Sequence, residues 1–317
     1  SVVSQVVGIA MLNLIGNAPT AWVFAVGVFL MASLDTLTDI SMNAHGLRVQ
    51  ELYGRPILNS FHGWWSIGAV CGGVIGSAAG QAGIPVWVQC VAATVVFGGM
   101  SLGAKTLLLP GLDHDPQAER SRQQRRRRLP AGAVMRLAAL GLLGASAGLM
   151  EDTGSTWGAI YLDRQFEVIP FVAGMAFVGL QGAQLIGRFT GDALVSRIGP
   201  RFAVVQGGII AFLGMGLSLI WPSPTTAILG FACVGWGVAT VIPSAMHAAD
   251  ELPDMNHGDG LMIVTWVMRI GFFAGPPLIG ALSEAADLRL ALWVVPAFAV
   301  VILVLSPSLG RSVGGRR

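Results

Sequence analysis

The chain has 317 residues, of which 54% are hydrophobic and 11% are charged, and its formal net charge is +2. A soluble domain carries roughly a quarter charged residues, so this chain has too few charges to cover a water-exposed surface. Composition therefore argues against a water-soluble protein and predicts an integral membrane protein. The three cysteines lie inside apolar runs, without the spacing of a metal site or a disulfide framework.

The apolar runs are long enough to cross a bilayer as helices. A spanning helix needs about 20 mainly apolar residues, and it satisfies its backbone hydrogen bonds internally. The predicted fold class is therefore all-α, a polytopic membrane protein. In chain order the runs cover ten ranges: 1–16, 20–44, 58–80, 85–104, 131–150, 170–190, 202–221, 225–247, 260–283 and 288–308.

The longest polar stretch, residues 105–130, contains four consecutive arginines and separates about four spans from about six. Such a run can bind nucleic acid, but between membrane helices the positive-inside rule is the better explanation and places it in the cytoplasm. We therefore predict an incomplete N-terminal helical half over 1–104 and a cytoplasmic basic linker over 105–130. A C-terminal six-helix half over 131–310 and a cytoplasmic tail over 311–317 follow.

The two halves share a weak repeat at an offset of 203 residues, in which the segment that begins at Ser66 matches the segment that begins at Arg269. At this offset residues 131–201 have no counterpart after Ser1. We therefore expect about two further helices upstream in the intact protein, so that ten of about twelve spans are present here.

Three motifs resemble the major facilitator superfamily. The segment 187–201 is similar to the loop signature that follows the second span of each half. The segments 37–69 and 151–162 ("EDTGSTWGAIYL") are similar to spans of a bacterial branch related to fucose-type sugar permeases. The resemblance implies the fold of that superfamily and the activity of a secondary transporter, and it implies no enzyme and no cofactor.

Ionisable groups inside spans are costly and are candidates for function. Asp35, Asp39 and Asn43 have the spacing i, i+4, i+8, so on a helix they share one face and could carry a proton. The alternative is that Asp39 lies near the inner helix end and pairs with Arg48 or Arg55. In the branch that this chain resembles, a carboxylate of the fourth span acts with one of the first span.

Three further segments carry candidates for a solute and proton path. Glu151 and Trp157 could bind sugar hydroxyls or a cation, or they could form a turn at the outer membrane interface. His62 and Trp65 follow in the fifth span, where a structural histidine is the alternative. Arg269 lies within an apolar run and is expected to face a cavity or an acid. The sequence predicts no metal site.

The segment that resembles the loop signature is predicted to be a cytoplasmic hinge that gates the inward side. Asp192 could pair there with Arg188, Arg197 or Arg201. The alternative is a loop that only orients the chain through its arginines. The predicted gating residues are Gly187, Arg188, Gly191, Asp192, Arg197, Gly199 and Arg201.

Together these features predict a multi-pass transporter of a bacterial cytoplasmic membrane, with the linker and C-terminus cytoplasmic. It is expected to move a small solute, a sugar or a drug-like molecule, by alternating access coupled to protons. The expected partners are this solute, protons and the lipid bilayer, with no nucleic acid and a monomeric state when full length. The alternatives are a drug or metabolite exporter of the same fold, a membrane sensor or scaffold, and an intramembrane enzyme.

Overall fold

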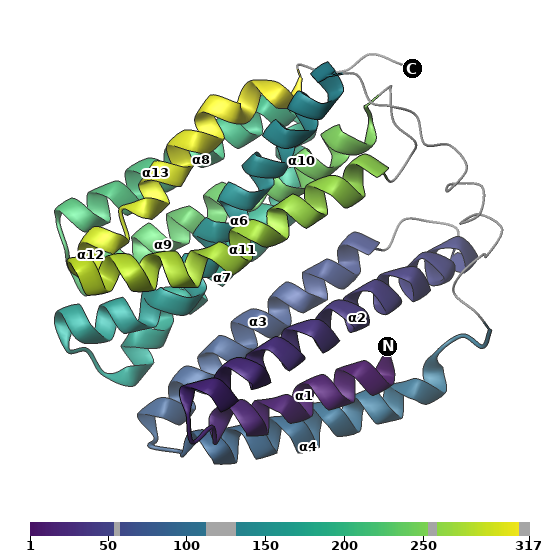
Figure 1. Ribbon diagram of the computed structural model, residues 1–317, viewed down its shortest axis with the longest axis vertical. Helices are drawn as coiled ribbons and strands as arrows, with labels where there is room; N and C mark the ends of the chain where they lie inside the picture. Colours follow the sequence, from purple (N-terminus) through teal and green to yellow (C-terminus); the bar gives the residue numbers. More distant parts are fainter. Residues whose placement is uncertain (54–57, 112–130, 253–258, 311–317) are drawn as a thin grey trace. The chain divides into compact units, whose positions relative to one another are not determined.

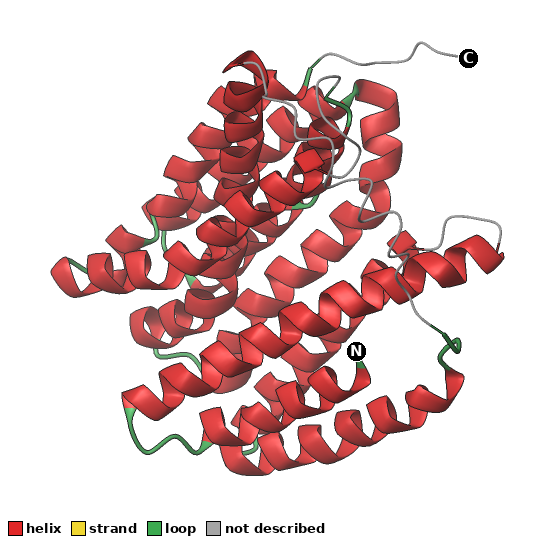
Figure 2. Ribbon diagram, turned by 45° about the vertical axis from the view of Figure 1, so that its right-hand side comes forward, coloured by secondary structure: helices red, strands yellow, loops and turns green. Residues whose placement is uncertain are grey.

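The computed structural model describes residues 1–53, 58–111, 131–252 and 259–310. Over these residues every element is a helix, as Figure 2 shows, and no strand occurs. The prediction of an all-α protein is therefore confirmed. Contacts divide the chain into two compact units, Ser1–His62 with Ala78–Arg125 and Gly63–Ser77 with Arg126–Arg317.

The first unit is built around helix α1 (Val2–Gly16), which packs against α2 (Ala21–Tyr53) and α4 (Val86–Ala104). Polar contacts fix these pairs. The Asn13 side chain donates to the Thr94 hydroxyl at 2.7 Å, and the hydroxyls of Thr38 and Ser4 are 2.9 Å apart. The two ends of α3 (Leu58–Gln81) belong to this unit, and the short helix η1 (Lys105–Leu107) follows α4.

The second unit has α6 (Ala131–Phe166) at its centre, in contact with α7, α9, α10, α11 and α13. Its central place is explained by apolar side chains that are almost fully buried, such as those of Leu140, Leu143 and Met150. Figure 1 shows the helices that surround it. These are α7 (Pro170–Ile198), α8 (Pro200–Ile220), α9 (Pro224–Val238), α10 (Val241–Asp250), α11 (Asp259–Ala285), α12 (Leu288–Ala291), α13 (Val294–Leu305) and η2 (Ser306–Leu309).

Each of the ten predicted ranges is mostly helical, but 225–247 is interrupted between α9 and α10 and 288–308 between α12 and α13. Eight helical segments of the described residues are long and apolar enough to cross a membrane, and α1 is a shorter apolar helix of 15 residues. Three predicted ends were too early. The helix expected over 20–44 continues to Tyr53. The helix expected over 131–150 continues to Phe166, and the one expected over 170–190 continues to Ile198. The polar side chains after residues 150 and 190 were interpreted as helix ends, although neither of these two segments contains a proline that would break a helix.

Glycines allow the backbones of neighbouring helices to touch in the second unit. Gly207 of α8 and Gly237 of α9 face one another so closely that a methyl group on either would meet the backbone oxygen of the other. On α6 and α11, Gly271 lies against the Ala145 carbonyl and Gly148 lies against the Phe272 ring. Such close approach is how small residues hold membrane helices together by van der Waals contact.

The joint between α7 and α8 is a single residue, Gly199, with φ 84° and ψ 157°. Only glycine adopts this backbone region readily, and Pro200 then begins α8. Gly199→Ala is therefore expected to cost about 1–3 kcal/mol. Gly182→Ala is the matched control, because nothing lies within 4 Å of a methyl group added at that helical position. Thermal unfolding of the two variants in detergent measures the difference, and equal midpoints would contradict the expectation.

Candidate functional site

Helices α6 and α7 pack antiparallel along one polar strip. Two glycines of α6 make the close approach possible, since Gly154 lies against the Leu180 side chain and Gly158 against Ala176. On either side of this apolar contact, polar side chains face each other. The strip is therefore built by helix packing and does not depend on a loop.

The polar residues on the two helices have helical spacing. Gln181, Gln184 and Arg188 stand at i, i+3 and i+7 on α7, while Glu151 and Ser155 stand at i and i+4 on α6. These spacings place each set on one face of its helix. Gln181, Gln184 and Glu151 are 4%, 1% and 7% exposed, so the strip lies inside the unit.

Glu151 is the centre of this network. The Gln184 side-chain amide donates to Glu151 Oε2 at 2.7 Å, and the Arg188 guanidinium lies 3.9 Å from Glu151 Oε1. The distance between Arg188 and Glu151 is short enough for an ion pair but too long for a direct hydrogen bond. The Gln181 amide lies 3.4 Å from the Ser155 hydroxyl, in position to donate. A buried carboxylate is thus held by one cation and one amide.

The middle section of α3, Gly63–Ser77, belongs to the same unit and contacts Arg188. The guanidinium donates to the Ser66 hydroxyl at 2.9 Å and lies 5.4 Å from the centre of the Trp65 ring. A cation over an indole face is attracted by the ring electrons. Arg188 is therefore held from two sides, by a carboxylate and by an aromatic ring.

Several buried polar atoms of α6 and α7 have no hydrogen-bond partner among the residues that the structure describes. Each is a position that a polar solute or a water molecule could satisfy, because a buried polar atom without a partner costs free energy. They are Gln181 Oε1, Gln184 Oε1, Asp152 Oδ2, Trp157 Nε1, Tyr161 OH and Thr153 Oγ1.

The structure brings some predicted site residues together. Glu151, Trp65 and Arg188 meet in one network, although Arg188 was expected in a gating loop and instead lies within α7. Trp157 lies on the α11 side of α6, beside Gly280. Arg269 lies on α11 with its side chain exposed.

Other predicted residues lie elsewhere. Asp35 is exposed and Asp39 half-buried on α2, in the first unit. Asn43 is in the same helix, but its side chain lies outside the described residues, as does the His62 side chain.

The predicted gating segment is mostly helix. Gly187 packs against Ala239 and Gly191 against Thr240, so these glycines are packing positions on α7. The Arg197 side chain is exposed and Arg201 is half-buried, on either side of the turn at Gly199. The Asp192 side chain lies outside the described residues, so its predicted ion pairs stay predictions.

Gln181, Gln184 and Ser155 were not among the site residues predicted from the sequence. The signal was present in "LQGAQLIGR", where two glutamines and an arginine repeat at helical spacing inside an apolar span. It was overlooked because Arg188 was interpreted only as part of the loop signature, although the predicted span 170–190 contains it together with both glutamines.

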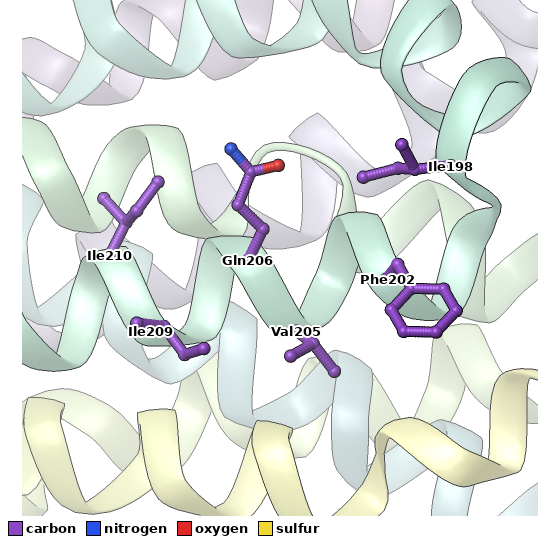
Figure 3. Close-up of a pocket in the computed structure, with 6 residues that line it drawn as sticks. All are labelled: Ile198, Phe202, Val205, Gln206, Ile209 and Ile210. Atoms are coloured by element: carbon purple, nitrogen blue, oxygen red, sulfur yellow. The ribbon is translucent and has the colours of Figure 1, made fainter.

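A shallow apolar groove lies apart from this network. It has a volume of about 580 Å³ and runs along α8 from the end of α7, with Gln206 as its one polar lining residue. Figure 3 shows Gln206 between apolar neighbours. None of the charged site residues lines it, so the groove is not the candidate site. No group of three or more His, Cys, Asp or Glu side chains suited to a metal ion occurs in the described part of the chain.

The long apolar helices define the class, a polytopic membrane protein. A family model described as the Major Facilitator Superfamily matches residues 140–311. An uncharacterized transporter of Sinorhizobium fredii, y4wD, is 31% identical over 93% of this chain and 76% of its own length. The chain therefore belongs to the major facilitator superfamily, a family of transporters and not of enzymes.

Two further comparisons agree with this assignment. Membrane protein MosC of Rhizobium meliloti is 28% identical over 96% of this chain and 72% of its own length. The solved structure of the E. coli fucose:proton symporter FucP matches with a TM-score of 0.61 at 16% identity. That match covers 98% of this chain and 84% of FucP, and it establishes the fold.

Proposed function

We propose that the chain is a proton-coupled secondary transporter that moves a small polar solute by alternating access, with Glu151, Gln184 and Arg188 in its solute and proton path. The observation that carries the proposal is the buried carboxylate of Glu151, held by an amide and a guanidinium inside an apolar helix pair. Charged groups in membrane spans are expensive and usually belong to a transport path.

The geometry suggests how a proton and a solute share this site. While Glu151 is ionised it attracts Arg188, and a proton on the carboxylate removes that attraction. The freed guanidinium and the unpartnered oxygens of Gln181 and Gln184 then offer one donor group and two acceptors to a hydroxyl-bearing solute. Proton and solute binding are coupled because both change the state of Arg188.

The remaining parts of the proposal follow the family. The printed title of FucP describes fucose:proton symport, which supports a sugar as the first solute to test. We place the counterpart of the Glu151 network on α2, at Asp35, Asp39 and Asn43, with His62 on α3. The turn at Gly199, with Arg197 and Arg201, is the proposed inward gate. The linker 105–130 and the tail 311–317 are proposed to be cytoplasmic.

Uptake into reconstituted vesicles tests the function. With L-fucose and a panel of neutral sugars as radiolabelled probes, an acidic exterior is expected to drive accumulation of one of them. Glu151→Gln should abolish the response to the pH gradient, because an amide cannot exchange a proton. Asp163→Asn, an exposed position at the end of the same helix, is the matched control and should keep it. Solute uptake that is equal with and without the gradient would rule out proton coupling.

A further inference from the structure

Asp152 lies on another side of α6 from the Glu151 network, against α11. A methyl group added at Gly275 of α11 would stand 3.3 Å from Asp152 Oδ2, so this carboxylate oxygen occupies the space that the glycine leaves. The oxygen is buried and has no hydrogen-bond partner among the described residues. An ionised carboxylate in such a place requires a cation or donor that the described side chains do not supply.

The segment of α11 beside this carboxylate has unusual backbone chemistry. Pro276 and Pro277 lie inside the helix and carry no N–H. The carbonyls of Phe272 and Phe273, four residues earlier, therefore lack their usual helical donors. Phe272 is one turn from Gly275, and its ring packs on Gly148 of α6. This stretch of α11 therefore contacts α6, the helix that carries Asp152.

The charges also leave a place for a cation. Glu151 is paired with Arg188, whereas the neighbouring Asp152 has no ion pair with a described side chain. With both carboxylates ionised, these three residues carry one negative charge more than positive. One monovalent cation would balance it, and carboxylate and carbonyl oxygens are the ligands that hard cations prefer. Backbone carbonyls of interrupted membrane helices bind Na⁺ in other transporter folds.

We propose that Asp152 and the proline-freed carbonyl of Phe272 on α11 form a binding site for one monovalent cation, either Na⁺ or the primary ammonium group of the solute. The proposal deepens the proposed transport function, on which it rests for its role. A bound Na⁺ would be a second coupling ion, and a bound ammonium would define the solute class as an amine. The site itself depends only on the packing of α6 against α11.

Binding can be measured on the purified chain without transport. Thermal unfolding is followed in choline chloride, sodium chloride and methylammonium chloride at equal ionic strength. We expect Na⁺ or methylammonium, but not choline, to raise the midpoint in a saturable way, since choline has no N–H to donate and is much larger than the other two cations. If only Na⁺ raises the unfolding midpoint, the site binds Na⁺, the proposed second coupling ion. If only methylammonium raises it, the site binds the primary ammonium group of the solute.

Asp152→Asn removes the charge at nearly constant shape and is expected to weaken the cation's apparent affinity by at least about tenfold. Asp163→Asn on the same helix should leave the midpoint response unchanged. Pro276→Ala tests the carbonyl with Asp152 intact, because it returns a donor to the Phe272 carbonyl and should also weaken the cation effect. This variant keeps the test decisive if Asp152→Asn does not fold.

Two outcomes would overturn the site: a wild-type chain that unfolds equally in all three salts, or a cation response that Asp152→Asn retains. A failed transport assay alone would not affect it. If no solute moves but the Asp152-dependent stabilisation is present, the cation site stands and the proposed transport function is wrong. If transport is present without cation binding, the proposed transport function stands and the cation site is wrong.

Discussion

Arg188→Met is expected to destabilise the second unit by about 2–4 kcal/mol, because it leaves the buried Glu151 carboxylate without its cation. The loss should be smaller than for a fully buried pair, since the Arg188 side chain is 28% exposed and partly solvated. Methionine keeps the length and apolar contacts of the arginine stem beside Trp65. The measurement is thermal unfolding in detergent together with uptake into vesicles.

The double variant Glu151→Gln/Arg188→Met is the control that isolates the charge. It leaves no unpaired charge at position 151, and the Gln184 amide retains an oxygen to which it can donate. We expect it to recover most of the stability lost in Arg188→Met while pH-driven uptake stays abolished. A double variant as unstable as Arg188→Met would show that the arginine acts by packing and not by pairing.

The second large effect is expected at the crossing of α8 and α9. In Gly237→Ala the new methyl group would meet the Gly207 backbone oxygen and stand 2.8 Å from the Ala211 side chain. Since the backbone cannot move aside as a flexible side chain can, the helices must separate. Overpacking of this kind costs about 1–3 kcal/mol and sometimes more, so we expect a loss of about 3 kcal/mol in thermal unfolding.

Gly216→Ala on α8 is the matched control for this prediction. A methyl group there has the Trp293 ring as its nearest neighbour, at 3.9 Å, which is ordinary van der Waals contact. Alanine also favours helix over glycine. This variant should therefore unfold at or slightly above the wild-type temperature. If both glycine variants unfolded at the same temperature, the close crossing of α8 and α9 would not limit stability.

The spans and the family could be predicted from the sequence because they depend on local properties. Hydropathy over about 20 residues identifies a membrane helix without knowledge of its neighbours. The motifs over 37–69, 151–162 and 187–201 indicated the superfamily, and the comparisons confirm it.

Helix ends were harder to predict. Glu151 and Asp152 were taken as the end of a span, yet they lie near the middle of the 36-residue helix α6. Hydropathy reports which residues lipid would tolerate. It does not report where a helix ends when charged residues face the protein interior, as Glu151 does. The same reason explains why α7 passes Arg188 and ends only at Gly199, the first residue whose backbone leaves the helical region.

The partners in the candidate site could not be predicted, because they come from helices far apart in the sequence. Glu151 and Gln184 are separated by 33 residues, and Arg188 and Ser66 by 122. Spacing along one helix can say that Gln181, Gln184 and Arg188 share a face. Which helix covers that face depends on packing at positions such as Gly154 and Gly158, and their contacts appear only in the folded chain.

The glycine contacts between α6 and α11 have a mechanical meaning. Gly271 locks against the Ala145 backbone, and Gly148 receives the Phe272 ring, so neither helix can slide along the other without a steric collision. We therefore expect the two helices to move as one rigid unit in any conformational change. Asp152 and Gly275 lie about one turn beyond these two contacts, within the same unit. A cation bound at the proposed site would keep its ligands on both helices while that unit moves.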